Sequence, residues 1–331
     1  MTQKTIYGQL AEVIGAGESS IVPEIFKMLA DEKEAAVLLA ASPPATVGEI
    51  ADKTGIPASA VEKMIDPLFK KGLLFISGKS GETRYYRVRS LFQFHDATIV
   101  TEGVSQDFYD LWKKYHRTEF KTFFKNVESI LDKSAVRVIP VNIAIDSGTR
   151  IAPFEDIKRY VEDAQNLAVT KCTCRVVDGS CGKPIEVCIQ INRAADYALQ
   201  RGTGRKLSKE EAIEMLKMCE QEGLVHTVFN NRSLGHVICN CCDDCCINWP
   251  GPRTSAVNFA APSRFAAVVD SELCSGCETC IDRCYFEAVT MEDGIAQIHE
   301  EKCMGCGLCA VTCPDGAIAL SEIRNEDFVP E

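Results

Sequence analysis

The chain has 331 residues, of which 46% are hydrophobic and 25% are charged, and it carries a formal net charge of −11. This composition is ordinary for a globular protein and excludes wholesale disorder, while the length allows two or three domains. The longest apolar runs, such as residues 35–41, are far too short to span a bilayer, and the first residues lack the features of a signal peptide. We therefore expect a cytoplasmic protein that does not insert into membranes.

The N-terminal third has the pattern of consecutive helices followed by a hairpin. Thr46, with Glu49 three residues later, is the signature of a capping box and predicts the start of one helix. Pro57 is expected in the first turn of the next helix, a position that proline prefers. Two short strands are predicted after it, at residues 73–76 and 85–88.

The sequence of these elements is similar to a winged helix-turn-helix domain. The resemblance rests on T-V-G-E-I-A-D-K-T-G-I at residues 46–56 and on K-G-L-L at residues 71–74, followed by the hairpin. It implies the fold of residues 1–92 but not their function, because winged helices bind DNA in some proteins and dock or dimerise in others.

Basic side chains on the predicted hairpin bear on the question of DNA binding. They would neutralise phosphates, and they are Lys79, Arg84, Arg87 and Arg89. The second helix has no Arg, Asn or Gln to read bases at its exposed positions, which are Ala58, Ser59, Ala60, Glu62 and Asp66. We therefore favour contacts with protein, including a second copy of this chain, and keep DNA as the alternative partner.

Residues 93–135 are predicted to form a helical connector that is dense in aromatic side chains. Aromatic residues at this spacing indicate a core or an interface more often than a cofactor site. They are Phe108, Tyr109, Trp112, Tyr115, Phe120, Phe123 and Phe124. The alternating Val and Ile residues of 135–145 then predict a strand that opens a middle domain.

Nine cysteines lie in two short segments of this middle domain. They are Cys172, Cys174, Cys181 and Cys188 in the first segment, and Cys239, Cys241, Cys242, Cys245 and Cys246 in the second. In a chain that is not exported these thiols stay reduced, so they are ligands or nucleophiles and not disulfide partners. Without a ligand, nine crowded thiols would be easily oxidised and mutually repelling. A metal centre is therefore predicted.

A helix between the two cysteine segments is predicted by the capping box of Ser208 and Glu211. We expect a helical hairpin built on it to bring the two segments together, with Cys219 as a buried small apolar residue on the helix. Arg175, next to Cys174, is expected either to donate hydrogen bonds to sulfur or to form an ion pair on the surface.

The last eight cysteines form two identical units, C-x-x-C-x-x-C-x-x-x-C, which lie 29 positions apart. In proteins with two such units, each unit supplies three thiolates to one cluster, and its fourth cysteine ligates the cluster of the other unit. One 4Fe-4S cluster is therefore expected on Cys274, Cys277, Cys280 and Cys313. The other is expected on Cys303, Cys306, Cys309 and Cys284.

Residues 268–321 resemble a bacterial-type ferredoxin that carries two 4Fe-4S clusters. Pro314 follows the fourth cysteine of the second unit as it does in that family, but Tyr285 occupies the equivalent place in the first unit. The departure affects the packing of one loop and not the ligands. Zinc and a disulfide framework are the alternatives, and both are disfavoured, because zinc sites usually need only two C-x-x-C pairs and disulfides would require a secreted protein.

The nature of the middle centre follows from its ligands and its neighbours. Soft thiolates select iron–sulfur clusters, zinc or copper(I). Next to two predicted clusters, a third iron–sulfur centre is favoured over zinc, and a fourth is left open. The whole pattern, K-C-x-C-R with C-N-C-C-x-x-C-C, is similar to a cysteine-rich region fused to ferredoxin domains in poorly characterised proteins of anaerobes. The resemblance implies redox work in an anaerobic or low-oxygen cell, without naming a substrate.

The charge of the chain is concentrated at its C-terminal end. Residues 270–331 contain 14 acidic and 3 basic residues, whereas residues 1–269 contain 33 of each. Such a field steers association with a basic partner and repels nucleic acid. We therefore expect a redox protein with a basic docking surface as the partner.

Together these features predict an α+β multidomain protein with four parts. They are a winged-helix domain at residues 1–92, a helical connector at 93–135, a cysteine-rich metal-binding domain at 136–262 and a two-cluster ferredoxin domain at 263–331. The function expected is one-electron transfer between the terminal clusters and the middle centre. Two alternatives are a reductase that binds its substrate at the middle centre and a redox-sensing transcription regulator.

Overall fold

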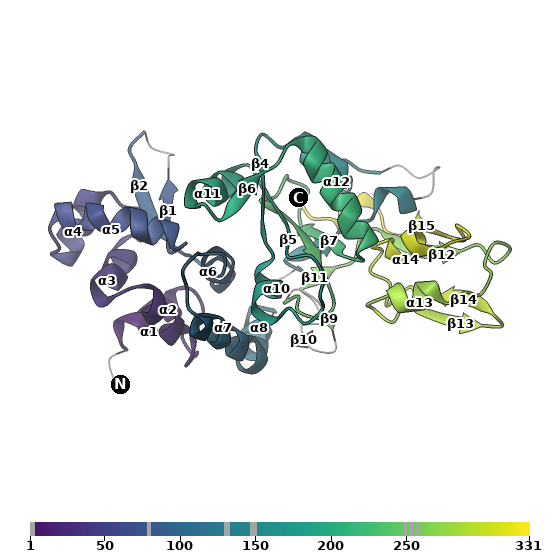
Figure 1. Ribbon diagram of the computed structural model, residues 1–331, viewed down its shortest axis with the longest axis horizontal. Helices are drawn as coiled ribbons and strands as arrows, with labels where there is room; N and C mark the ends of the chain where they lie inside the picture. The colour runs from purple at the N-terminus through teal and green to yellow at the C-terminus, as the bar shows by residue number, and fades with distance from the viewer. Residues whose placement is uncertain are drawn as a thin grey trace. The chain divides into compact units, whose positions relative to one another are not determined.

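The computed structural model describes residues 4–77, 81–128, 133–145, 151–247, 250–251, 254–255 and 259–331, so the predicted hairpin residue Lys79 lies outside the described residues. Helices and strands are mixed along the chain, which confirms the α+β class (Figure 1). None of the described helices is long and apolar enough to cross a membrane. The chain divides into two compact units. The N-terminal unit comprises Met1–Phe124, Val176–Asp178 and Gln200–Thr203, and the C-terminal unit comprises Lys125–Arg175, Gly179–Leu199 and Gly204–Glu331.

The N-terminal part of the chain is mainly helical, with one described strand pair. Its helices are α1 (Ile6–Val13), α2 (Val22–Leu29), α3 (Glu32–Ala40), α4 (Val47–Thr54), α5 (Ala58–Lys70), α6 (Leu91–Thr98), α7 (Gln106–Thr118) and α8 (Phe120–Glu128). The two strands, β1 (Leu74–Ser77) and β2 (Arg84–Arg87), are antiparallel. The predicted hairpin is thus confirmed, with each strand displaced by one residue.

Local sequence signals set the helix boundaries in this unit. Thr46 accepts a hydrogen bond from the backbone N–H of Glu49, whose side chain accepts one from the Thr46 N–H, so the predicted capping box is confirmed. Pro57 is the residue before α5 and not a member of its first turn, a difference of one position from the prediction. Most of the predicted aromatic residues are buried in the core, including Phe108, Trp112 and Tyr115.

The middle of the chain forms one sheet, which has seven strands among the described residues, in the order β11-β3-β7-β8-β5-β4-β6. All neighbouring strands are antiparallel except β11 and β3, which are parallel. The strands are β3 (Val136–Val138), β4 (Leu167–Lys171), β5 (Glu186–Ile191), β6 (Gly204–Lys206), β7 (Val225–Phe229), β8 (Val237–Cys241) and β11 (Ala260–Ala261). The predicted strand at 135–145 is confirmed only as β3, because a 3-10 turn, η1 (Asn142–Ala144), follows it.

Four helices and a small separate strand pair accompany this sheet. The helices are α9 (Ile157–Glu162), α10 (Thr173–Asp178), α11 (Arg193–Arg201) and α12 (Lys209–Gln221), and the strand pair is β9 (Pro250–Gly251) with β10 (Thr254–Ser255). The capping box predicted at Ser208 and Glu211 is present at the start of α12.

The two faces of the sheet bury different residues. Side chains alternate between the faces along each strand. Ile189 on β5 and Ile238 on β8 are paired across the strands and lie in a core with Tyr160 of α9 and Leu216 of α12. The cysteines that precede Ile189 and follow Ile238 therefore lie on the opposite face of the sheet.

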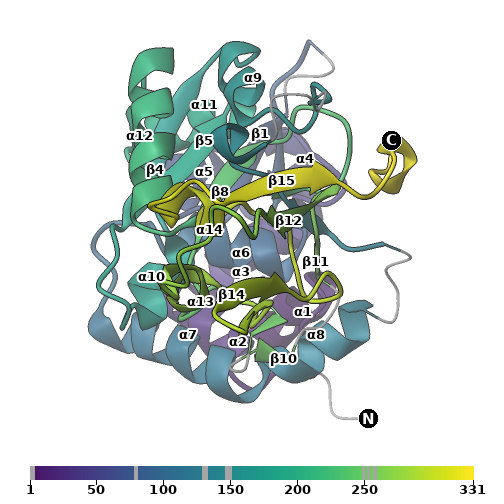
Figure 2. The same cartoon turned by 90° about the vertical axis from the view of Figure 1, so that its right-hand side faces the viewer.

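The C-terminal end of the chain forms what we call the terminal repeat region, residues 265–322. Strand β12 (Phe265–Val269) pairs antiparallel with β15 (Ile318–Glu322), and β13 (Val289–Glu292) pairs antiparallel with β14 (Ile295–Ile298). Helices α13 (Thr279–Arg283) and α14 (Leu308–Thr312) contact each other, and a 3-10 turn, η2 (Glu326–Phe328), follows β15 (Figure 2). The starts of α13 and α14 are 29 positions apart, as are those of β13 and β15, so the cysteine repeat is also a structural repeat.

The terminal repeat region is packed against the rest of the C-terminal unit. Arg264, just before β12, forms an ion pair of 2.8 Å with Glu155, and both side chains are almost fully buried. The N–H of Val141 donates a hydrogen bond of 3.0 Å to the carbonyl oxygen of Cys306. These contacts hold the second cysteine loop next to the segment that follows β3.

Candidate metal centres

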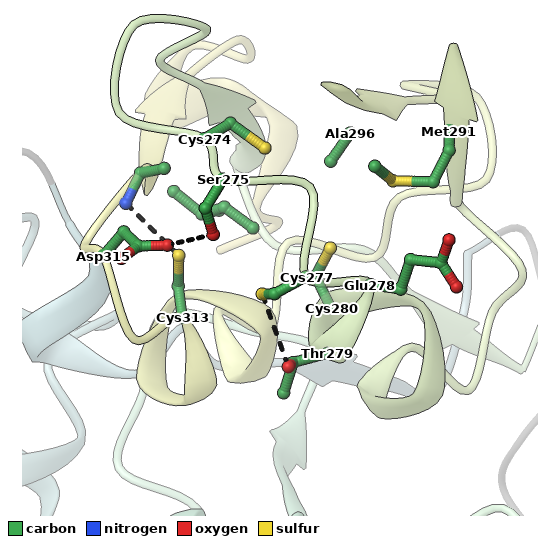
Figure 3. A pocket seen from close by; sticks show the side chains of 12 residues that line it. Cys274, Ser275, Cys277, Glu278, Thr279, Cys280, Met291, Ala296, Cys313 and Asp315 are labelled. Carbon is green, nitrogen blue, oxygen red and sulfur yellow. Dashed lines mark hydrogen bonds between the residues drawn. The ribbon is translucent and has the colours of Figure 1, made fainter. Parts of the chain in front are cut away.

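Two hollows in the terminal repeat region are lined by cysteines. The sulfur ligand candidates of the first hollow are Cys274, Cys277, Cys280 and Cys313. Their sulfur atoms surround a common space (Figure 3). The candidates of the second hollow are Cys284, Cys303, Cys306 and Cys309. Each hollow thus collects three thiols from one loop and a fourth from the other repeat.

The loops around these hollows require glycine. Gly276 has φ of 73°, and a Cβ atom there would lie 2.5 Å from the carbonyl oxygen of Gly294. Gly305 has φ of 63°, and a Cβ atom there would lie 2.1 Å from the carbonyl oxygen of Phe265. Any larger residue would be strained in its backbone and would collide with a neighbouring strand or turn. Glycine at these two positions therefore permits the tight curvature of the cysteine loops.

Hydrogen bonds reach several of the sulfur atoms in the hollows. The N–H groups of Ala317 and Ala267 lie 3.2 Å from the Cys313 sulfur and 3.5 Å from the Cys303 sulfur. The hydroxyl of Thr279 donates to the sulfur of exposed Cys277, which lowers the pKa of that thiol. Donors of this kind stabilise a thiolate and, when a cluster is bound, raise its potential. These residues fit a cluster with thiolate ligands.

Strand pairing brings the two middle cysteine segments together. In the register of β5 and β8, Ile189 is opposite Ile238, so Cys188 and Cys239 are neighbours on the same face. On the other side of β8, Cys239 is opposite Thr227 of β7. The predicted helical hairpin is therefore wrong as the joining element. Helix α12 covers the apolar face of the sheet, and the antiparallel strands β5 and β8 join the segments.

Six of the nine middle thiols form a closed ring of interacting side chains, which we call the six-thiol group. The thiol of Cys172 interacts with those of Cys174 and Cys188, and Cys188 also interacts with Cys239. The ring continues from Cys239 to Cys241, from Cys241 to Cys246 and from Cys246 back to Cys174. All six are buried except Cys239, which is partly buried. The ring joins residues of β5, β8 and the start of α10.

The other three middle thiols, Cys181, Cys242 and Cys245, form a separate three-thiol group. Their sulfur atoms all lie within 4.8 Å of one another, and those of Cys242 and Cys245 are 3.2 Å apart. The hydrogen bond with Cys245, together with the nearby Arg175 guanidinium, lowers the pKa of Cys242 to about 5. Cys242 is therefore a thiolate at neutral pH, which is the form that binds metal.

Arg175 lies between the two thiol groups. Its side chain is 3% exposed, so the surface ion pair considered as an alternative is wrong. One guanidinium nitrogen donates a 2.7 Å hydrogen bond to the carbonyl oxygen of Asn240, and the side chain is also bonded to Cys242. Burial would lower the pKa of Arg175, but the Cys172 and Cys242 sulfurs raise it. A permanent cation therefore sits next to these thiols.

Cys219 belongs to neither group. It is fully buried on α12, and burial raises the pKa of its thiol to about 12. A neutral, buried thiol behaves as a small apolar side chain, as the sequence predicts.

Sequence reasoning missed the residues that connect the terminal repeat region to α12. Arg283 donates a hydrogen bond of 3.0 Å to the carbonyl oxygen of Glu220, and the Tyr285 hydroxyl donates one of 2.6 Å to that of Gly223. The only available signal was that Tyr285 stands where the second unit has a proline. The structure gives this departure a role in packing.

Comparisons with known proteins identify a 4Fe-4S domain of the ferredoxin type near the C-terminal end of the chain. Residues 296–319 match a family described as "4Fe-4S binding domain". The chain therefore carries a 4Fe-4S ferredoxin domain near its C-terminus.

Curated relatives match the same kind of domain. "Hydrogenase-4 component A" of Escherichia coli is 36% identical over 66 residues, which are 19% of this chain and 32% of the relative. An uncharacterized ferredoxin of Methanocaldococcus jannaschii is 43% identical over 49 residues, 14% of this chain and 32% of the relative. "Formate hydrogenlyase subunit 2" of E. coli is 41% identical over 59 residues, 17% of this chain and 29% of the relative. The chain spans only about a third of the length of these relatives, and no solved structure matches it.

Proposed function

We propose that the protein transfers single electrons between a redox partner and its cysteine-rich middle region. The main observation in support is that each of two hollows is lined by four thiols, three from one cysteine unit and the fourth from the other. This grouping supports one 4Fe-4S cluster on Cys274, Cys277, Cys280 and Cys313, and another on Cys303, Cys306, Cys309 and Cys284. Bound there, the clusters would supply one-electron redox chemistry at low potential.

The packing of the terminal repeat region supports different roles for the two cluster sites, which we number first and second in the order of the two hollows. The second site lies next to the middle region, because Val141 donates to the Cys306 carbonyl and a Cβ at Gly307 would lie 2.7 Å from Ala144. Tyr285 lies close enough to Cys242 and Cys306 for both to influence its pKa, which burial raises to about 12. A neutral phenol therefore lies near both the second site and the three-thiol group. We assign the second site to exchange with the middle region.

The first site is the one that faces solvent. Cys277 is exposed, and the acidic residues Glu278, Asp282 and Asp315 near it are also exposed. A negative rim favours encounter with a basic surface. We therefore assign the first site to exchange with the partner protein. Two of the relatives are named as a component or a subunit, which supports a role for this chain with protein partners.

We propose that the N-terminal unit is a winged-helix domain that docks or dimerises. The helix pair α4–α5, the hairpin β1–β2 and a bridge between Ala45 and Tyr85 support this fold. The described basic residues of the hairpin are engaged within the chain. Arg84 is paired with Glu49, Arg87 donates to the Val88 carbonyl, and Arg89 lies over the ring of Tyr86. Phosphate contacts would have to compete with these interactions, which argues against the regulator alternative.

The test of electron transfer is a redox titration of the protein purified without oxygen. Iron and sulfide analysis should give at least two cubanes per chain, and electron paramagnetic resonance should show two interacting clusters that each accept one electron. A chain that holds no reducible iron after anaerobic purification would refute the proposal.

A further inference from the structure

The nine middle cysteines separate into two groups, and neighbours in sequence are divided between them. Cys241 and Cys246 belong to the six-thiol group, whereas Cys242 and Cys245 belong to the three-thiol group. Strand β8 ends at Cys241 and the chain then turns, so one cysteine of each adjacent pair belongs to each group. The C-C-x-x-C-C motif therefore faces two sites at once.

The three-thiol group has the dimensions of a site for a single ion. A tetrahedral zinc ion with Zn–S bonds of about 2.3 Å holds its sulfur ligands about 3.8 Å apart. The sulfur atoms of Cys181, Cys242 and Cys245 lie within 4.8 Å of one another, and those of Cys242 and Cys245 are 3.2 Å apart. In a cubane each thiolate binds a different iron, so its ligands stand further apart. The three-thiol group fits one tetrahedral ion better than a cluster.

One coordination position of such an ion has no protein ligand. In the part of the chain that the structure describes, no fourth His, Cys, Asp or Glu joins the group within 4.8 Å. Arg175, which interacts with Cys242, is a cation and cannot ligate a metal. Its Nε is buried and, among the described residues, has no hydrogen-bond partner. Three protein ligands with one open position are the arrangement of catalytic zinc sites, whereas structural sites have four.

The charges around the group suit a divalent ion and a small donor from solution. A divalent ion with three thiolates carries one net negative charge, which the buried Arg175 guanidinium balances. Cys242 and Cys245 are buried, whereas Cys181 is partly exposed between exposed Ser180 and Gly182. The open position is therefore reached from the Cys181 side. A soft metal–thiolate site favours a sulfur donor at that position.

We propose that Cys181, Cys242 and Cys245 bind one zinc ion whose fourth position takes water or a small exogenous thiol, separate from the centre held by the six-thiol group. This inference specifies which metal one part of the cysteine-rich middle region holds in the proposed function. It does not depend on electron transfer, because it concerns metal held by this chain's own thiols. It gives the protein a place where a thiol substrate can bind next to the second cluster site.

The test compares the metal content of full-length variants purified without oxygen. Cys181→Ser should lose zinc and keep all its iron, whereas Cys188→Ser, in the six-thiol group, should keep zinc and lose the other middle metal. Cys219→Ser, the matched control for a cysteine in neither group, should keep both. Loss of the same metal from the Cys181 and Cys188 variants, or a wild-type protein without zinc, would overturn the proposal. Cys274→Ser separates the two claims, because it should remove a terminal cluster and leave zinc in place.

The open position is tested with cobalt(II) in place of zinc and 2-mercaptoethanol as the probe. The visible spectrum of the cobalt form should change in a saturable way as the thiol is added, toward that of a tetrahedral site with four thiolates. The Cys181→Ser variant should lack this response. A wild-type spectrum that is indifferent to the thiol would show that the fourth position is already filled, and would refute the open site.

Discussion

The hydroxyl of Tyr285, in the terminal repeat region, donates a 2.6 Å hydrogen bond to the carbonyl oxygen of Gly223, just after α12. Gly223 has φ of 75°, and a Cβ atom there would meet the Tyr285 hydroxyl at 2.9 Å. The end of α12 and the residue after the first cysteine unit are thus packed so closely that a residue larger than glycine would not fit at position 223. This contact couples the sheet of the middle region to the loop that carries Cys284.

Tyr285→Phe should therefore weaken this junction. Loss of one hydrogen bond to a backbone carbonyl should lower the free energy of unfolding by about 0.5–1.5 kcal/mol, measured by anaerobic urea denaturation. The iron content should not change, because Tyr285 is not a ligand. Tyr7→Phe is a matched control, since the Tyr7 hydroxyl donates to the Ala30 carbonyl in the N-terminal unit. If only the Tyr285 variant slows reduction of the second cluster, the junction also serves electron transfer.

Each hollow contains cysteines from both repeat units, so substitutions in different units should remove the same cluster. Cys274 and Cys313 are 39 positions apart but line one hollow, so Cys274→Ser and Cys313→Ser should remove the same cluster. Cys303→Ser should remove the other. Electron paramagnetic resonance of the reduced variants distinguishes the two clusters. Spectra in which the Cys274 and Cys313 variants lose different signals would contradict the assignment.

The buried ion pair of Arg264 and Glu155 should be important for stability. Arg264→Ala would leave the Glu155 carboxylate buried without its partner, so we expect a loss of about 3–5 kcal/mol in the free energy of unfolding. Glu322 also contacts Arg264, but it is 40% exposed. Glu322→Gln should therefore cost about 1 kcal/mol or less. Equal losses in the free energy of unfolding of the two variants would show that burial does not strengthen the effect of the Arg264–Glu155 pair on stability.

The middle metal should be independent of the terminal clusters. Replacing Cys172 and Cys174 by Ser removes two adjacent members of the six-thiol ring, so metal should be released from the middle region. The two terminal clusters should remain, because their ligands lie in other hollows. Metal analysis with spectroscopy of the double variant is the measurement. Full retention of metal by a folded double variant would exclude these residues as ligands.

The acidic rim of the first site should govern the encounter with a partner. Glu278→Gln, Asp282→Asn and Asp315→Asn should together slow electron exchange with the physiological partner and leave the iron content unchanged. The rate of the wild-type protein should fall with added salt, which screens charges over roughly 10 Å at 0.1 M. Glu62→Gln, an exposed substitution in the N-terminal unit, is the control. Stopped-flow rates that ignore both salt and the three substitutions would show that electrons enter elsewhere.

The sequence alone determined the features that depend on nearby residues. The capping boxes at Thr46 and Ser208 join groups three positions apart, so they are readable without the fold. The terminal cysteine loops are equally local, because each supplies three thiols within seven residues and its glycines permit the turn. The repeat offset then indicated how the two loops would be paired.

Only the tertiary structure decided how the middle cysteines are grouped. Cys188 and Cys239 are 51 positions apart and become neighbours through the register of β5 and β8, which no local pattern specifies. Cys241 and Cys242 are adjacent in sequence and yet belong to different groups, because β8 ends at Cys241 and the chain turns after Cys242. Closeness in the sequence therefore does not predict which thiols are grouped together. The grouping is decided by strand pairing and by the path of the chain beyond the strands.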